Sequence, residues 1–286
     1  MCWWHAVCSY SEQSFAHSTD SHRGMRMSTS SVRDTEREFV QSLGRGLAVL
    51  QQFSHQRPTL TISEAASLTG LTRATARRIL FTLEQLGYVR ADGRRFAPTP
   101  RLLGIGYAYL SSMDVWQAAH PFLAELAELS QESCSASTLD GTDVVYVARV
   151  ASRRVMAVNL GVGARVPAYP TSMGRVLLAG LSPQQLDHYF ATVPLVRLTP
   201  RTVTDEGELR EIVSRVREQG WSVVDQELED GLCSVAAPVH DRTGEVFAAL
   251  TICGHAGRVT APQLRDELLP HLLAAAKQIT HQVERR

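Results

Sequence analysis

Three arginines stand within six residues of the segment TRATARRIL, which spans residues 72–80 of a 286-residue chain. A guanidinium group can hold a phosphate, and it can donate two parallel hydrogen bonds to the edge of a guanine. At about 100° per residue on a helix, Arg73, Arg77 and Arg78 turn away from the apolar residues of the same segment. Arginines on a helix face are often merely solvated, so the surrounding elements decide whether these side chains contact an anion.

Two helices are predicted before this segment. The first begins at Ser42, and the second is capped by Thr61 or Ser63 and ends at Thr69 and Gly70. The inward residues expected on the first helix are Leu43, Leu47, Leu50 and Phe53. Those expected on the second are Ile62, Ala65, Ala66 and Leu68.

A third helix is predicted from a cap at Thr72 to Leu86, where Gly87 supplies the left-handed residue on which helices often end. Its expected core face consists of Ala76, Ile79, Leu80, Leu83 and Leu86. Two helices joined by a short turn form a helix-turn-helix, whose second helix enters the major groove of DNA. We expect Arg73 and Arg77 at base edges and Arg78 at a phosphate.

Residues 88–90 and 95–97 are predicted as the two strands of a wing, joined at Asp92 and Gly93, with Arg94 and Arg95 at its tip. Residues 39–101 hold nine arginines and three acidic residues, a net charge of +6, although the whole chain has 29 basic and 29 acidic residues. Such a basic module gains affinity by displacing counterions from phosphates. The candidate contacts to double-stranded DNA are Arg45, Ser63, Thr72, Arg73, Thr75, Arg77, Arg78, Arg94 and Arg95.

The rest of the chain predicts a linker helix and an α+β domain. The linker helix is expected over residues 98–112, and a further helix over residues 114–130 that Pro121 interrupts. Strands are expected at residues 135–139, 144–150, 155–160, 221–224, 234–239 and 245–253. Helices are expected at about residues 173–180, 183–190, 205–219 and 263–281. An antiparallel sheet flanked by helices is typical of a sensor domain.

The sequence contains none of the common catalytic motifs GxGxxG, P-loop, GxSxG or HExxH, and its ten histidines and five cysteines lack metal-ligand spacing. We therefore expect no catalytic residue, no metal and no cofactor. One alternative is a small-molecule enzyme with an accessory DNA-binding module, in which Cys233 or Asp225 acts. Another is an interaction hub whose winged helix binds protein, although such a hub has no need of a basic face.

The first 38 residues are rich in Ser, Thr and His and show neither a regular period nor a signal-peptide pattern. We expect a disordered tail, or a mis-set start with Met25 or Met27 as the true first residue. The expected domains are residues 39–99 for DNA binding, 100–113 for the linker and 114–286 for the sensor. No apolar run approaches the ~18 residues of a membrane span, and the odd number of scattered cysteines favours a reducing cytoplasm.

Four segments, in this order, are similar to the IclR family of bacterial transcription regulators: SLGRGLAVLQQF, TISEAASLTGLTRATARRILFTLEQLGYV, RVPAYPTSMGRVLLAGL and GWSVVDQELEDGLCSVAAPV. The resemblance covers residues 39–286. Residues 146–180 and 223–239 most resemble the branch that controls the beta-ketoadipate pathway of aromatic catabolism, whose members respond to protocatechuate, 4-hydroxybenzoate or beta-ketoadipate. The family implies a winged helix-turn-helix that reads a palindromic operator, a linker helix that dimerises, and a GAF-like effector-binding domain that often pairs dimers into tetramers.

The resemblance also implies an effector pocket, lined by Thr171, Ser172, Met173, Asp225 or its neighbour Val224, Ser234, Thr251 and Cys253. Cys253 stands where the family has a serine, which is a stronger hydrogen-bond donor. An anionic effector favours a helix N-terminus, which the segment PTSMGR supplies, and a nearby cation. The candidate cations are Arg149, Arg165 and Arg175, each of which could instead be a surface or salt-bridging arginine.

Overall fold

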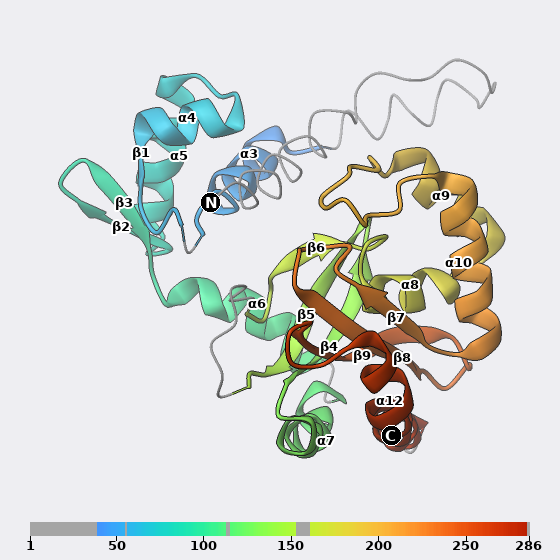
Figure 1. Cartoon of the computed structure of the whole chain (residues 1–286). Helices are drawn as coiled ribbons and strands as arrows, with labels where there is room; N and C mark the ends of the chain where they lie inside the picture. Colours follow the sequence, from blue (N-terminus) through green and yellow to red (C-terminus); the bar gives the residue numbers. More distant parts are fainter. Residues whose placement is uncertain (1–38, 55, 113–114, 153–160, 285–286) are drawn as a thin grey trace. The chain divides into compact units, whose positions relative to one another are not determined.

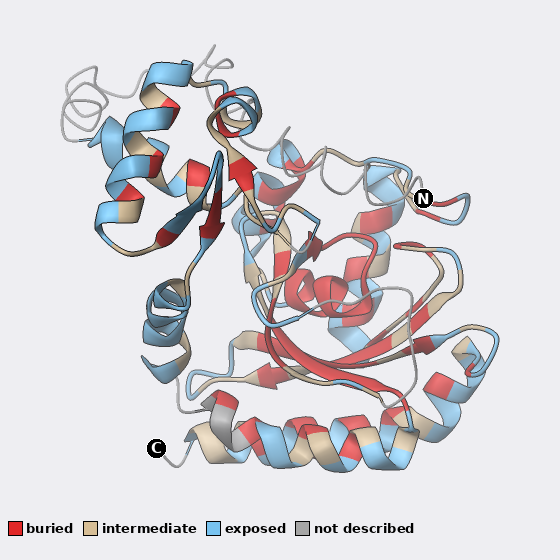
Figure 2. Cartoon of the chain, turned by 90° about the vertical axis from the view of Figure 1, so that its left-hand side faces the viewer, coloured by how far each residue is buried: buried red, intermediate tan, exposed pale blue. Residues whose placement is uncertain are grey.

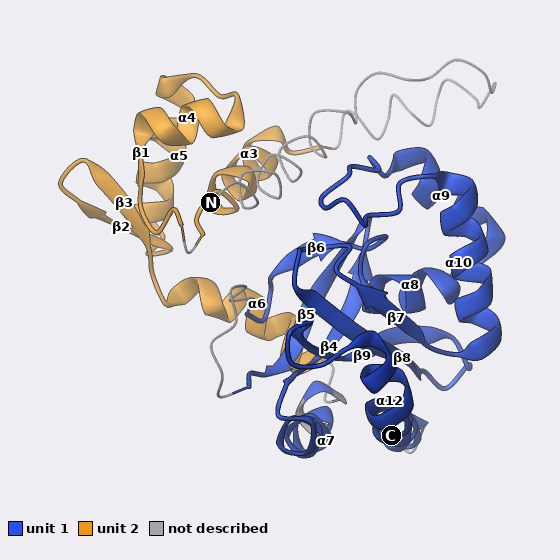
Figure 3. Cartoon of the chain, in the orientation of Figure 1, with its two compact units in different colours: residues 1–18, 113–286 blue, residues 19–112 orange. Residues whose placement is uncertain are grey.

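The computed structural model describes residues 39–54, 56–112, 115–152 and 161–284. These residues divide between two compact units, 39–112 and 115–284, which Figure 3 shows in different colours. The expected tail of residues 1–38 and the expected strand over residues 155–160 lie outside the described residues.

The N-terminal unit is a small helical bundle with a short antiparallel sheet (Figure 1). Its elements are α3 (Gln41–Leu50), β1 (Leu60–Thr61), α4 (Ile62–Thr69), α5 (Arg73–Gln85), β2 (Val89–Asp92), β3 (Arg95–Pro98) and α6 (Arg101–Ser112). The strand order is β1-β3-β2. Thr61 caps α4 in a capping box with Glu64, and Gly70 ends this helix with a left-handed backbone. The hydroxyl of Thr72 caps α5 by accepting a hydrogen bond from the Thr75 N–H.

The core of this unit contacts α3 only near its C-terminal end. Val49 is fully buried and Leu50 packs against the core, whereas Leu43 and Leu47 are 62% and 47% exposed. The expectation of an inward Leu43 and Leu47 is therefore wrong, because the buried cluster does not extend to the earlier turns of the helix. Leu86 is also exposed, since it is the C-cap that follows the last packed turn of α5.

The turn of the wing lies one residue later than expected. Asp92 ends β2 and pairs with Arg95, the first residue of β3, so Gly93 and Arg94 form the turn. Gly93 has φ of +60°, as the first residue of a two-residue hairpin turn requires. Arg94 therefore lies at the tip of the wing, and Arg95 lies in a strand.

The C-terminal unit is built on a six-stranded antiparallel sheet. Its elements are α7 (Val115–Ser130), β4 (Ser133–Asp140), β5 (Asp143–Val150), β6 (Arg165–Pro167), α8 (Ser172–Ala179), α9 (Pro183–Thr192), α10 (Glu206–Gln219), β7 (Ser222–Asp225), β8 (Leu232–His240), β9 (Val246–His255), α11 (Ala261–Gln263), η1 (Leu264–Leu268) and α12 (Leu269–Glu284). The strand order is β6-β5-β4-β9-β8-β7. Helix α8 packs on one face of the sheet, and α7 and α12 pack on the other (Figure 2).

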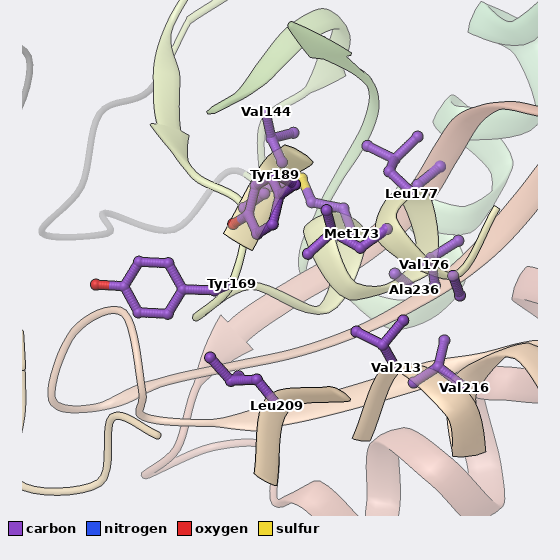
Figure 4. Packing of buried hydrophobic residues seen from close by; sticks show 14 of the residues in the cluster. Val144, Tyr169, Met173, Val176, Leu177, Tyr189, Leu209, Val213, Val216 and Ala236 are labelled. Carbon is purple, nitrogen blue, oxygen red and sulfur yellow. The ribbon is translucent and has the colours of Figure 1, made fainter. Parts of the chain in front are cut away.

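Every residue of α8 is buried, because this helix lies between the sheet and α10. Gly174 permits its close approach to the preceding segment, since a Cβ at this position would lie 2.0 Å from the Ala168 carbonyl oxygen. The apolar cluster around α8 is seen in Figure 4. Its members include Val144, Met173, Val176, Leu177, Leu209, Val213, Val216 and Ala236.

The expected α+β fold class, a helix-turn-helix unit followed by an antiparallel sheet with helices, is confirmed. Helix α7 continues through Pro121, which was expected to interrupt it, because packing against β5 and α12 outweighs the one backbone hydrogen bond that proline cannot make. The edge strand β6 was not predicted, since three residues are too few for an alternating pattern. Among the described residues, no helix combines the length and the apolar character that a bilayer span requires.

Candidate nucleic-acid interface and ligand pocket

Helix α5 presents its arginines to solvent. Ala76 and Leu80 of this helix are fully buried, whereas Arg73, Arg77 and Arg78 are exposed and have no ion-pair partner among the described residues. The Arg77 guanidinium lies 5.2 Å from the centre of the Phe81 ring, a cation–π distance. All three cations are therefore available to an anion, and Arg77 is partly oriented by an aromatic ring.

Arg95 is engaged within its own unit. Its guanidinium donates to the Thr59 hydroxyl at 2.6 Å and to the Glu64 carboxylate at 3.1 Å. Glu64 is also the capping-box residue, and the Thr61 N–H and hydroxyl, followed by Arg95, lower the pKa of its carboxyl group. The pair connects β3 to the start of α4, so Arg95 orients the wing.

The other predicted DNA contacts are spread over the surface of this unit. Arg94 is exposed at the wing turn, and Ser63 is exposed in the first turn of α4. The hydroxyls of Thr72 and Thr75 lie 2.9 Å apart at the start of α5. Arg45, on α3, donates to the side chain of Gln41.

A cavity lies in the C-terminal unit between the start of α8 and the sheet, with about 320 Å³ of empty space when its open mouth is counted. The expected residues that line it are Thr171, Met173, Val224, Ser234, Thr251 and Cys253. Ser172 lies beside it, donating to the Ser234 hydroxyl at 2.8 Å and lying 3.5 Å from that of Thr251. The structure thus gathers these residues from α8, β7, β8 and β9.

Asp225 does not line this cavity, in contrast to its neighbour Val224. The Asp225 carboxylate accepts a hydrogen bond from the Cys233 thiol at 2.8 Å and forms an ion pair with Arg201. Burial, followed by the bond to Asp225, raises the pKa of Cys233 to about 12. A nucleophilic cysteine must be a thiolate, so this arrangement disfavours the enzyme alternative.

Arg149 is the candidate cation on the same face of the sheet as the cavity, although it is not one of the residues that line it. Arg149 and Thr251 both pair with Ser135 from opposite sides, which puts the three side chains on one face of the sheet. Its guanidinium makes a hydrogen bond of 3.5 Å to Ser133 and has no acidic partner among the described residues. Burial raises the pKa of Cys253, in the cavity wall, to about 12, and the nearby charge of Arg149 opposes this rise.

The other two cations are paired. Arg175 is buried, with its Nη2 atom 2.7 Å from the Glu227 carboxylate and its Nε donating to the Tyr169 carbonyl at 3.0 Å. Arg165 contacts the carboxylates of Asp140 and Asp143 at 2.6 and 3.1 Å. The structure therefore does not support Arg175 as a ligand contact, because its charge is neutralised inside the protein by a residue distant in sequence.

Four lining residues were missed: Tyr146, Pro170, Leu228 and Leu232. Tyr146 lies on β5 and Leu228 in the loop between β7 and β8. These segments come together only through pairing between strands that are distant in sequence. One signal was nevertheless present in β4, where Ser133, Ser135 and Ser137 alternate and are all buried. Polar residues at every second position of a buried strand indicate a polar face of the sheet, here the face that carries Thr251, although these serines do not line the cavity themselves. Within the described parts of the chain, no group of three or more His, Cys, Asp or Glu side chains could hold a metal ion.

Two family models match the two units. The IclR helix-turn-helix domain matches residues 42–93, and the model described as bacterial transcriptional regulator IclR C-terminal matches residues 107–281. The chain belongs to the IclR family. It is therefore a regulator of transcription with a helix-turn-helix unit and an IclR-type C-terminal domain.

Known relatives cover most of this IclR-family chain. The Pca regulon regulatory protein of Pseudomonas putida is 44% identical over 247 residues, which are 86% of this chain and 85% of the relative. The crystal structure of a transcriptional regulator from Rhodococcus sp. RHA1 is 48% identical, with a TM-score of 0.75 over 86% of this chain and 98% of its own. The inducer-binding domain of the PobR transcription factor from Acinetobacter, a double mutant in complex with 3-hydroxybenzoic acid, is 32% identical, with a TM-score of 0.56 over 59% of this chain and 98% of its own.

Proposed function

We propose that this IclR-type regulator senses a small organic acid, an aromatic acid or beta-ketoadipate, and controls genes of aromatic catabolism in the cytoplasm. The observation that carries the proposal is Arg149, a cation without an acidic partner among the described residues, on the sheet face that carries the cavity residue Thr251. Arg149 is half-buried, and a partly desolvated cation without a counter-charge attracts an anion, so such a site favours an anionic ligand. The names of the P. putida and Acinetobacter relatives support the aromatic branch.

Thermal unfolding with protocatechuate, 4-hydroxybenzoate, muconate and beta-ketoadipate tests the sensing directly. A ligand that binds only the native state raises the midpoint, and the rise grows with the logarithm of the ligand concentration once this exceeds the Kd. We expect one of these acids to raise it and the variant Arg149→Met to lose most of that rise. No shift with any of the acids at millimolar concentration would contradict the proposed effector class.

DNA binding is proposed to use the exposed arginines of α5 and the wing. Arg73 and Arg77 would contact base edges, Arg78 and Arg94 phosphates, and Arg45, Ser63, Thr72 and Thr75 the flanking backbone. Arg95 would hold the wing in position through Glu64. The proposal predicts specific retention of the upstream region of the regulator's own gene in a mobility-shift assay, weakening steeply as salt rises.

Self-association is proposed to cover two apolar faces of the N-terminal unit. Phe39, which precedes α3, and Leu43 and Leu47 on that helix follow one another at four-residue spacing and are 47% to 65% exposed. On α6 Leu103 and Tyr107 are exposed on one side of the helix, and Ile105 and Tyr109 are exposed on another. A second copy of the chain fits these faces, since a palindromic operator requires two reader units. Light scattering should find a homodimer or homotetramer, and the variant Leu103→Glu should shift it toward monomer.

A further inference from the structure

The loop between β7 and β8, residues 226–231, is held in one conformation. Gln226 has a left-handed backbone, with φ of +61°, and its N–H donates to the Leu232 carbonyl at 2.8 Å. Its side-chain oxygen accepts from the Gly231 N–H at 2.9 Å. Between these residues, the Glu227 carboxylate binds Arg175. The loop is therefore fixed at both of its ends and at its second residue.

Glu229, in this fixed loop, has a buried carboxylate oxygen without a partner. Its Oε2 atom is enclosed and makes no hydrogen bond among the described residues. Burial, and next the neighbouring Asp230, raise the pKa of this carboxyl group. Buried polar atoms are nearly always hydrogen-bonded in native proteins, so an unpartnered carboxylate oxygen on a rigid loop calls for a ligand or another explanation.

Glu229 adjoins the cavity, although it is not one of the residues that line it. Its loop neighbour Leu228 and Leu232, the first residue of β8, both line the cavity. The charge of Glu229 acts on Cys253 of the cavity wall, on which the charge of Arg149 also acts. In the strand order, Arg149 on β5 and the loop between β7 and β8 lie on opposite sides of β9, which carries Cys253. The Glu229 carboxylate, which can accept a hydrogen bond, and the Arg149 guanidinium therefore approach the same wall of the cavity from opposite sides.

We infer that Glu229 is a specificity-determining residue that accepts a hydrogen bond from a hydroxyl group of the effector, while Arg149 binds its carboxylate. The ligand class is then a hydroxy acid, with its hydroxyl and carboxylate at opposite ends. This inference rests on the proposed acid-sensing function and adds the second recognition point. A site that must satisfy a buried acceptor rejects analogues that lack the donor.

The experiment is a titration calorimetry comparison of 4-hydroxybenzoate with benzoate, which differ only in the hydroxyl group. The variant Glu229→Leu should lower the affinity for 4-hydroxybenzoate by about 10-fold or more, because a hydrogen bond to a charged acceptor is lost. Its affinity for benzoate should stay the same or increase. The variant Glu229→Gln, which keeps an acceptor oxygen, should fall between the native protein and Glu229→Leu for the hydroxylated acid. Glu218→Leu, the same change at an exposed position of α10, is the matched control and should change neither affinity.

Three results would overturn the inference. Equal losses for both acids would mean that Glu229 supports the loop and does not recognise the hydroxyl group. Tighter binding of benzoate than of 4-hydroxybenzoate by the native protein would also overturn the inference. Binding of beta-ketoadipate alone, strengthened in Glu229→Leu because a negative charge is removed, would refute the hydroxyl contact but keep the proposed function. Failure of every acid to bind the native protein would instead refute the proposed function itself. Thermal unfolding of each variant without ligand confirms that it is folded.

Discussion

The two units use arginine in opposite ways. In the N-terminal unit, Arg73, Arg77, Arg78 and Arg94 are exposed and have no acidic partner among the described residues. In the C-terminal unit, arginines that touch the interior are paired, as Arg175 is with Glu227 and Arg258 with the buried Glu132. Arg149 departs from this rule beside the cavity. The difference indicates that an arginine available to bind a ligand is identified by the lack of an acidic partner, and not by its exposure alone.

The largest effect is expected from breaking the buried pair. Arg175→Met leaves the Glu227 carboxylate buried without its cation, and we expect the free energy of unfolding to fall by about 3–5 kcal/mol. Urea denaturation of the C-terminal unit measures this loss. The double variant Arg175→Met with Glu227→Met should recover part of it, because no buried charge is left. A single variant as stable as the native protein would show that the pair does not hold the α8 region together.

The next largest effect concerns the readout of DNA by α5. Arg77→Lys keeps the charge and loses the two parallel donors of arginine, so specific operator affinity should fall by about 1–3 kcal/mol. Arg78→Lys should retain most of the affinity, because a lysine can replace an arginine at a phosphate. Fluorescence anisotropy with operator and scrambled duplexes measures both. Equal losses in the two variants would contradict the proposed division between base and phosphate contacts.

The smallest effect concerns the exposed pair of the wing. Glu64→Gln weakens both the capping box and the bond to Arg95, and the expected loss of stability is below about 1 kcal/mol at neutral pH. The folded protein lowers the pKa of Glu64, so its contribution is present above the unfolded value of 4.5 and disappears as the pH falls through the lower folded value. Thermal unfolding of the two proteins should therefore differ at pH 7 and converge toward pH 3. A constant difference across this range would rule out an ionised Glu64 as the cause.

The features that were predictable from the sequence are local ones. Thr72 and Gly87 define the ends of the recognition helix through a side-chain cap and a left-handed backbone, both of which depend on adjacent residues. The roles of Arg175 and Arg95 were not predictable, because their acidic partners lie 52 and 31 residues away along the chain. The alternating serines of β4 show that a polar face of the sheet, next to the cavity residue Thr251, was visible in the pattern. The apolar residue Leu228 of the cavity wall was not predictable, because the pairing of β7 with β8 determines where its loop lies.

The most direct test of the account measures whether an acid in the cavity changes DNA binding. Operator titrations of the native protein and of Arg149→Met would be compared with and without 4-hydroxybenzoate, protocatechuate and beta-ketoadipate. The account predicts that one of these acids shifts the native operator affinity by about 5-fold or more, a common size of allosteric coupling, and has no effect on Arg149→Met. An operator affinity that none of the acids alters, or an acid effect that persists undiminished in Arg149→Met, would contradict it.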